Sequence, residues 1–477
     1  MQIPFVGGAY LARSTSLNAQ RCVNLFAEKD ESGTGKNVAA LIGTPGLRRL
    51  ATLGGTGGVR AVWTPTTGNM IAVQGSSVYS VSSSWVATLL GSISTTTGPV
   101  SIADNGIYAV IVDGSTSGYV VTLATSAFAA ITDPDFLGAD KVDYIDDLFV
   151  FNRPDTGQFY ISGFGTTDFD ALDFATAEGS PDNISAFIVD HRQLLIFGEE
   201  SGEIFENTGN ADFPLERAGN VFIEQGCAAA FGITKIDNTV FWNGAGRVGY
   251  GIIWRLDGAR PVRISTHALE FALQGYSTIA DCIAYAYQQG GHSFVMLTFP
   301  TANATWCFDA STGLWHERAW LNPATGQLNR HRSNCHAYFA NTHVVGDWED
   351  GRLYALDLDY YTDDGDPLPR IRAAAHISKE DYKRIRFDAL QIDFETGVGT
   401  QTGQGVDPQA MLDWSDDGGR TWSAQHSRSI GRVGRYRDKV RWKRLGQSDD
   451  RVYRVTVTDP VKVVIIGASS EAVGLTS

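Results

Sequence analysis

The chain has 477 residues, 43% of them hydrophobic, and 38 Lys and Arg against 53 Asp and Glu give it a net charge of −15. This length exceeds what one hydrophobic core organises, so we expect two or more structural units. No apolar run approaches the roughly 18 residues that a membrane helix needs, and the opening MQIPFVGGAY lacks the pattern of a signal peptide. Composition therefore argues against membrane insertion, and 52 Gly against 4 Met favours a turn-rich β protein.

Residues 1–58 form an N-terminal segment with strand-like runs between Ala39 and Leu53. A ring of repeated sheets closes when strands from both ends of the chain share one sheet. We therefore expect strands of this segment to complete the repeat fold that follows.

The most informative feature is a loose internal repeat in residues 59–359. Each unit is a short apolar strand, a tight polar turn and a second strand that carries an aromatic residue. The units begin at Met70, Ile107, Leu148, Leu194, Thr239, Ser293 and Val344. A period of about 40 to 50 residues with several short strands is typical of a β-propeller blade. The repeat favours seven blades and allows six if the unit from Val344 belongs to the following linker, and helical periodicity is confined to Thr266–Leu273.

The propeller is expected to end at a linker, residues 360–371, where YYTDDGDPLPR interrupts the strand pattern. The charge changes sign there: residues 370–477 hold 18 Lys and Arg against 14 Asp and Glu, net +4, which leaves −19 for residues 1–369. Six or so short alternating runs follow, so residues 372–477 are predicted to form a β-sandwich. Its core candidates are Phe387, Leu390, Ile392, Phe394, Leu412, Trp422, Trp442, Val452, Val455, Val457, Val463 and Ile465. The predicted fold class is all-β, a propeller plus a C-terminal sandwich.

One motif within the sandwich resembles the Asp-box, a hairpin turn of sialidases and many other β proteins. Its residues are Ser415, Asp417, Gly419, Thr421 and Trp422. Glycine permits the left-handed backbone of the turn, the Asp carboxylate accepts turn amides, and the Trp is expected to be buried beneath. The motif holds no nucleophile or acid/base pair, so we interpret it as a structural turn.

The densest basic run is RSIGRVGRYRDKVRWKR, in which Asp438 is the one acidic residue. Solvent, the DNA backbone or an acidic protein surface could face these cations. The apolar residues Ile430, Val433, Tyr436, Val440 and Trp442 are interleaved with them and are expected to fix the cations in a row on a sheet. Because Arg outnumbers Lys six to two, bidentate pairing with carboxylates or phosphates is favoured. Since residues 1–369 have a net charge of −19, copies of the chain offer many carboxylates, and we expect a contact with protein rather than with DNA. The candidate interface residues are Arg428, Arg432, Arg435, Arg437, Lys439, Arg441, Lys443 and Arg444.

No arrangement of residues indicates catalysis, a cofactor or a metal. The five cysteines form no CxxC pair and are interpreted as buried thiols in a reducing compartment. His316, His331, Cys335 and His336 are interpreted as unliganded strand and turn residues. Two acidic pairs are interpreted as solvated hairpin turns: Asp146-Asp147 and Glu199-Glu200.

Two terminal stretches resemble the packaged-DNA stabilisation proteins of short-tailed phages, also called tail accessory or tail hub proteins. Near the N-terminus the shared elements are Val23-Asn24-Leu25 before an acidic loop and a Pro45-Gly46-Leu47 turn before basic residues. Near the C-terminus Trp442-Lys443-Arg444 precedes an alternating strand and an aliphatic closing strand. The strand-rich middle agrees in length and order.

This resemblance implies a non-enzymatic virion protein that assembles in the host cytoplasm as a homo-oligomeric ring, expected to be a hexamer. Such a ring attaches below the portal and its adaptor, extends the DNA channel, retains the genome, and supports a tail needle, fibres or tailspikes. An acidic wall agrees with passing contact with DNA. Because copies of the chain in a ring bring many carboxylates close together, we expect the basic run to contact a neighbouring subunit or the adaptor. The alternative is a phage receptor-binding or glycan-binding or glycan-cleaving propeller, in which Trp-rich loops such as WNGAGRVGYGIIWRL, residues 242–256, would bind sugar.

Overall fold

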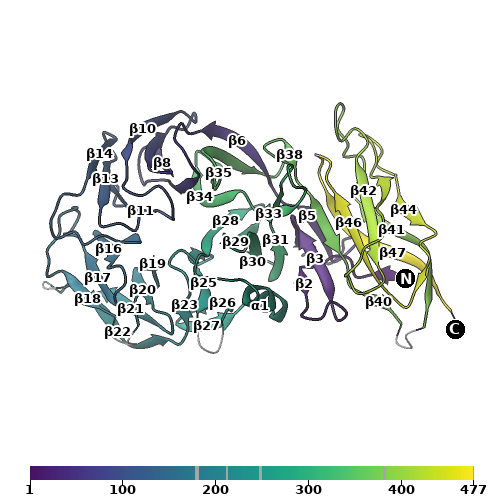
Figure 1. Cartoon of the computed structure of the whole chain (residues 1–477), viewed down its shortest axis with the longest axis horizontal. Coiled ribbons are helices and arrows are strands. Elements are labelled where there is room, and N and C mark those ends of the chain that lie inside the picture. Colours follow the sequence, from purple (N-terminus) through teal and green to yellow (C-terminus); the bar gives the residue numbers. More distant parts are fainter. Residues whose placement is uncertain (178–181, 211–212, 246–249, 380–382, 476–477) are drawn as a thin grey trace.

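The computed structural model describes residues 1–177, 182–210, 213–245, 250–379 and 383–475. A disc of radially arranged sheets occupies one end of the long axis and a stack of two sheets occupies the other (Figure 1). The all-β architecture of a propeller plus a C-terminal sandwich is therefore confirmed.

The disc is built from antiparallel arrays of four strands; in the described residues four of these arrays are separate sheets and three belong to larger sheets. The first three are β7 (Val59–Trp63), β8 (Met70–Gln74), β9 (Ser77–Val81) and β10 (Ala87–Ser92); β11 (Ser101–Asp104), β12 (Tyr108–Val112), β13 (Gly118–Thr122) and β14 (Ala127–Ala130); and β15 (Val142–Ile145), β16 (Leu148–Asn152), β17 (Gln158–Ile161) and β18 (Phe174–Thr176). The next two are β19 (Ala186–Asp190), β20 (Gln193–Phe197), β21 (Gly202–Asn207) and β22 (Leu215–Ile223); and β24 (Ile233–Ile236), β25 (Thr239–Ala245), β26 (Ile253–Asp257) and β27 (Arg260–Arg263), where β23 (Gly226–Cys227) also pairs with β25. The last two are β28 (Ile283–Gln289), β29 (His292–Phe299), β30 (Ala304–Asp309) and β31 (Leu314–Glu317); and β34 (Ser333–Phe339), β35 (Thr342–Asp347), β36 (Arg352–Asp357) and β6 (Gly46–Thr52).

The repeat units supply the two central strands of each sheet. The unit from Val344 supplies β35 and β36 of the last sheet, outside any linker. Helix α1 (His267–Gln274) lies where helical periodicity was expected, and the hydroxyl of Thr266 caps it by accepting from the Leu269 amide at 3.2 Å. A two-stranded ribbon, β32 (Ala319–Leu321) and β33 (Leu328–Arg330), precedes the last sheet. Within the described ranges no helix has the length and apolar character to cross a membrane.

An N-terminal strand closes the ring of propeller sheets. Strand β6 pairs with β36 from Arg352↔Thr52 to Asp357↔Gly46, and β7 at the start of the ring packs against β34 at its end. The earlier strand of the expected region, β5 (Ala39–Gly43), instead pairs with β4 (Leu25–Lys29) and with a strand of the sandwich.

Strands from both ends of the chain form the sandwich. One sheet has the order β4, β5, β47 (Val464–Gly474), β41 (Ile385–Phe394) and β44 (Val440–Lys443), with β1 (Gln2–Ile3) on β47 and β45 (Gln447–Ser448) on β41. The other contains β3 (Ala19–Val23), β39 (Arg370–Ala373), β46 (Asp450–Val457), β42 (Gln409–Ser415) and β43 (His426–Ser429), with β2 (Tyr10–Leu11) on β3 and β40 (Ile377–Ser378) on β46.

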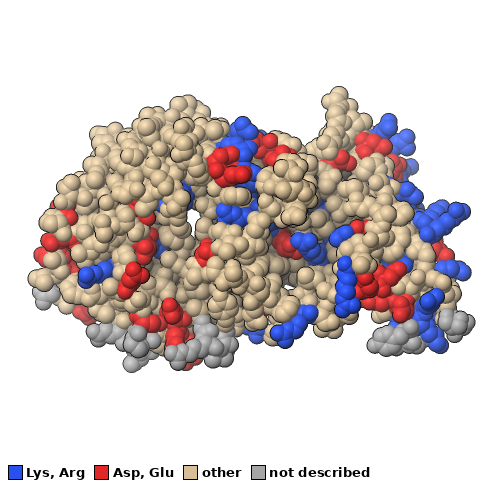
Figure 2. Space-filling view, in the orientation of Figure 1, with Lys and Arg blue, Asp and Glu red and all other residues tan. Residues whose placement is uncertain are grey.

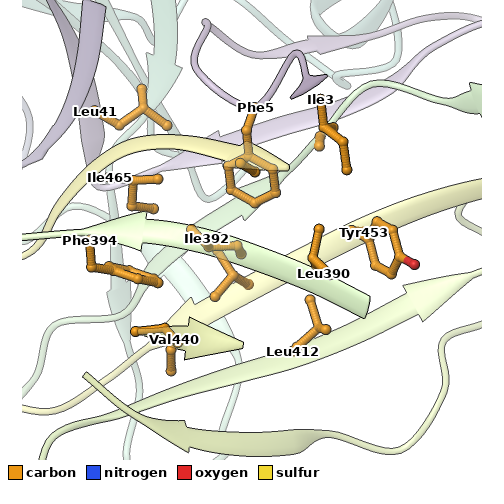
Figure 3. Close-up of a cluster of buried hydrophobic side chains, with 14 of the residues drawn as sticks. Ile3, Phe5, Leu41, Leu390, Ile392, Phe394, Leu412, Val440, Tyr453 and Ile465 are labelled. Atoms are coloured by element: carbon orange, nitrogen blue, oxygen red, sulfur yellow. The ribbon is translucent and has the colours of Figure 1, made fainter. Parts of the chain in front are cut away.

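The sandwich core is shared between the N-terminal segment and the C-terminal strands. Ile3, Phe5 and Leu41 pack in one cluster with Leu390 and Ile465 (Figure 3). Of the predicted core residues, all but Trp422 are buried. The sandwich is therefore incomplete without residues from the first 43 positions.

The propeller and the sandwich share a continuous sheet. Strand β3 pairs with β31 of the sixth propeller sheet through Val23↔Glu317 and with β39 of the sandwich through Arg21↔Ala373. The expected linker holds a hairpin, β37 (Thr362–Asp363) and β38 (Asp366–Pro367), that pairs with β6. The domain limits 1–58, 59–359, 360–371 and 372–477 remain a proposal, since strands of the first segment are divided between both units.

Candidate interaction surfaces

The basic run lies on strands β43 and β44 and on the loop between them, which we call the basic loop (residues 431–439). Seven of its eight cations are exposed, and Arg441 is half-buried. Lys and Arg gather along the outer side of the sandwich, whereas Asp and Glu predominate at the far end of the propeller (Figure 2).

The prediction that a sheet fixes these cations in a row is wrong for the basic loop. Ile430, Val440 and Trp442 are buried as predicted, but Val433 is 51% and Tyr436 74% exposed. The cause is local, because Gly431 and Gly434 adopt left-handed φ values of 108° and 81° and end the strand alternation. The loop therefore presents apolar and cationic side chains together to solvent.

Few of these cations are neutralised within the chain. Arg435 lies 3.9 Å from Asp438, Arg441 pairs with Glu471, and Arg428 donates to the Arg441 carbonyl at 3.2 Å. Six form no ion pair with any residue in the described part of the chain: Arg428, Arg432, Arg437, Lys439, Lys443 and Arg444. Exposed, unpaired Arg beside exposed Tyr is the composition typical of protein-binding hot spots.

The Asp-box is a turn held by its own hydrogen bonds. Asp417 accepts from the Thr421 hydroxyl at 2.6 Å and from the amides of Thr421 and Arg420 at 2.9 Å, and these bonds hold its pKa below the usual range. Ser415 Oγ donates to Asp417 at 2.7 Å and accepts from the Gly419 amide at 2.7 Å. Trp422 is only partly buried. The Arg454 guanidinium carbon lies 3.8 Å from the centre of the Trp422 ring and covers it in place of further core residues. These hydrogen bonds of the Asp417 carboxylate are all made within the turn.

The histidines and cysteines are built into the packing. His331 is buried against Ser333 Oγ at 2.6 Å, and burial lowers its pKa to about 3. His336 contacts His343 at 3.1 Å, and His316 accepts from Arg318 at 3.1 Å. Burial raises the pKa of the Cys335 thiol to about 12. Across the described ranges no group of three His, Cys, Asp or Glu residues could hold a metal ion.

The acidic pairs lie in hairpin turns, Asp146-Asp147 between β15 and β16 and Glu199-Glu200 between β20 and β21. In the Trp-rich segment, Trp242 is fully buried and Trp254 half-buried, while residues 246–249 lie outside the described residues. The described tryptophans of this segment thus offer no exposed sugar platform.

Sequence reasoning missed a second exposed surface, on the third propeller sheet. After β17, the segment FGTTDFDALDF runs to the first residue of β18 and exposes Phe164, Leu172 and Phe174 beside Asp168 and Asp170. We call these five residues the blade-three patch. In the sequence this patch is an apolar and acidic run without strand alternation. Such a run predicts an ordinary loop, so it did not indicate a surface of interest.

Comparison with known families decides the class. Residues 1–361 match the model of the bacteriophage P22 Gp10 β-propeller, and residues 370–472 match the model of the bacteriophage P22 Gp10 β-sandwich. The chain belongs to the P22 Gp10 family. It is therefore a phage structural tail protein of the packaged-DNA stabilisation type, as the terminal motifs indicated.

Two solved structures are similar to the chain at low identity. The WD40 β-propeller domain of Doa1 is 11% identical with a TM-score of 0.41, covering 65% of this chain and 96% of that one. The computationally designed Ika8 protein is 13% identical with a TM-score of 0.37, covering 65% and 99%. Among curated proteins no relative with a matching sequence was found.

The motifs that pointed to the P22 Gp10 family have structural roles. Asn24 lies between β3 and β4, fully buried, and its φ is 53°. Gly46 and Leu47 begin strand β6, so the expected turn at Pro45-Gly46-Leu47 is instead the start of the ring-closing strand. The basic residues that follow form ion pairs, Arg48 with Asp357 at 2.8 Å and Arg49 with Asp364.

Proposed function

We propose that this protein is a tail hub, or nozzle, that assembles as a ring below the portal and its adaptor. The ring extends the DNA channel, retains the packaged genome, and carries the needle, fibres or tailspikes. It performs no catalysis, and it is assembled into particles in the host cytoplasm.

The observation that carries the proposal is that residues 1–361 match the P22 Gp10 β-propeller model and residues 370–472 match the P22 Gp10 β-sandwich model. Charge supports it, since residues 1–369 have a net charge of −19. A surface of this sign does not grip phosphates, so DNA can move past it. The exposed basic loop and its tyrosine support a protein contact in the same assembly.

The experiment is to produce particles from a phage that carries a stop codon in this gene. We expect heads that package DNA and then lose it, with retention restored by the purified wild-type protein. Copy number in intact particles, measured by quantitative mass spectrometry against the portal, is expected to be that of a ring. Particles that keep their DNA without the protein would contradict the proposal.

The alternative function, glycan binding or cleavage, predicts that the purified chain binds or cleaves a glycan. Sialosides and other glycans are incubated with the purified chain, and neither turnover nor saturable binding is expected, because the arginines that converge in the described residues, Arg49, Arg332 and Arg352, are each held in ion pairs by carboxylates of the chain itself. Turnover abolished by changing one carboxylate would favour the rival.

A further inference from the structure

We propose that the basic loop of one copy binds the blade-three patch of a second copy, head to tail. The inference deepens the proposed function, because it names the surfaces that join neighbouring subunits of the ring.

The blade-three patch has the composition of an interface that is open in the monomer. Phe164 is 63% exposed, Leu172 80% and Phe174 43%. Large apolar side chains that are exposed together usually mark a binding surface. The loop that carries them is ordered by its own backbone bonds, from Gly163 to Asp168 at 2.9 Å and from Asp173 to Asp170 at 3.0 Å.

The acidic residues of the patch lack cationic partners. Asp168 and Asp170 are exposed, and neither forms an ion pair with any residue that the structure describes. Asp173 lies beside them, and its pKa is raised by burial and by the charge of Asp170. A cation that approached this corner would relieve that repulsion.

The basic loop offers the matching groups. Its exposed apolar residues are Val433 and Tyr436, flanked by Arg432, Arg435 and Arg437. Arg pairs with carboxylates in a bidentate geometry, and Tyr buries a large area against apolar neighbours. Each surface thus combines exposed apolar area with charge, and the two charges are opposite.

The position of the two surfaces makes the contact intermolecular. The third propeller sheet and the sandwich lie at opposite ends of the long axis (Figure 1), and acidic and basic side chains gather at those same ends (Figure 2). One copy therefore cannot satisfy both surfaces itself. A contact between two different surfaces repeats from copy to copy, and it gives a ring when the rotation closes.

A second copy fits these surfaces better than DNA does. DNA would pair with the cations of the loop, but it would leave Val433 and the acidic patch without a partner. A second copy covers both apolar surfaces and neutralises both charges.

The test is a charge exchange in the full-length protein. Arg435→Glu with Arg437→Glu is expected to weaken self-association by about tenfold or more, because like charges then face each other. Asp168→Arg with Asp170→Arg is expected to do the same. Mixing the two variants is expected to restore association, since each junction then joins opposite charges.

Sedimentation velocity at low and high salt measures association, and a thermal melt checks that each variant is folded. The matched control is Arg260→Glu with Arg420→Glu, which reverses two exposed arginines elsewhere and is expected to leave association unchanged. Association that survives both reversals, wild-type protein that stays monomeric at its highest soluble concentration, or a mixture that stays dissociated would overturn the inference. Steep salt-dependent binding of duplex DNA that the loop reversal alone abolishes would assign the loop to DNA instead.

A disulfide test on particles separates this inference from the proposed function. A chain with Leu172→Cys and Tyr436→Cys is expected to form cross-linked ladders in particles upon oxidation, whereas the exposed control Val38→Cys with Leu172→Cys is not. Multiple copies on particles without cross-links would refute the contact and leave the hub function intact. Absence of the protein from particles would refute the hub function itself.

Discussion

Asn24 and Ala319 hold each other through two reciprocal hydrogen bonds. Asn24 Nδ2 donates to the Ala319 carbonyl at 2.7 Å, and the Ala319 amide donates to Asn24 Oδ1 at 2.9 Å. Asn24 Nδ2 also donates to the Pro369 carbonyl at 2.9 Å. One buried side chain therefore joins the N-terminal segment, the propeller and the entry to the sandwich.

Replacing this amide is expected to destabilise the whole chain. Asn24→Leu leaves two carbonyls and one amide unpaired in a buried site, at about 1–3 kcal/mol for each group. The urea midpoint of unfolding should fall well below that of the wild type. Asn183→Ala, at an exposed asparagine, is the control and is expected to have no effect. Equal midpoints for Asn24→Leu and the wild type would contradict the role of this contact.

Gly46 is expected to tolerate no side chain. A Cβ at this position would lie within 2.5 Å of the Thr362 carbonyl oxygen and closer still to that of Tyr360. Gly46→Ala must therefore displace the start of β6 and weaken the closure of the ring. Limited proteolysis should detect faster cleavage of the propeller. Gly219→Ala, where an added Cβ meets nothing within 4 Å, should leave the cleavage rate unchanged.

A buried ion pair and an exposed one should differ in their contribution to stability. Arg332 Nε lies 2.6 Å from Asp347, which also accepts from the Tyr354 hydroxyl at 2.7 Å, and both charges are buried. Arg332→Ala is expected to lower the free energy of unfolding by about 3–5 kcal/mol, because it leaves the buried Asp347 carboxylate with only Arg352, 3.9 Å away, as a cationic partner. Arg386→Ala breaks an exposed pair with Asp388 and should have little effect on stability. Denaturant titration of both variants measures the difference, and similar costs would refute it.

The stability of the chain is expected to fall with rising pH between about pH 4 and 7 through one residue. Burial raises the pKa of Asp363 from its ordinary value of 3.8 to about 7. Between these values the carboxyl is ionised in the unfolded chain and protonated in the folded one, so unfolding releases a proton. In that window the free energy of unfolding therefore falls by at most about 1.4 kcal/mol per pH unit. Above about pH 7 the contribution of Asp363 no longer changes with pH.

The matched variants are Asp363→Asn and Asp359→Asn, the second at an exposed position. The difference between wild-type and Asp363→Asn stability should change with pH only in this window. Asp359→Asn should follow the wild type throughout. A wild-type curve parallel to that of Asp363→Asn would show that the carboxyl has no raised pKa.

The propeller strands were predictable because each repeat unit carries its own apolar pattern and turn. The sandwich core was predictable for the same reason, since Leu390, Ile392 and Phe394 alternate along β41. The contribution of Ile3 and Phe5 to that core was not, because these residues lie in or beside a two-residue strand whose partner is hundreds of positions away. Exposure of Tyr436 was also missed, because glycine conformation overrides the alternation there.

The pairing of β1 with β47 and of β6 with β36 has a consequence for how the chain is made. The ribosome releases the first strands long before their partners exist, so residues 1–52 must wait for the synthesis of strands that end at Asp357 and Gly474. Contacts of such sequence separation make folding slow and leave unpaired strand edges open meanwhile. A subunit released before β36 is complete can close neither its propeller nor its sandwich, and one released before β47 is complete cannot close its sandwich.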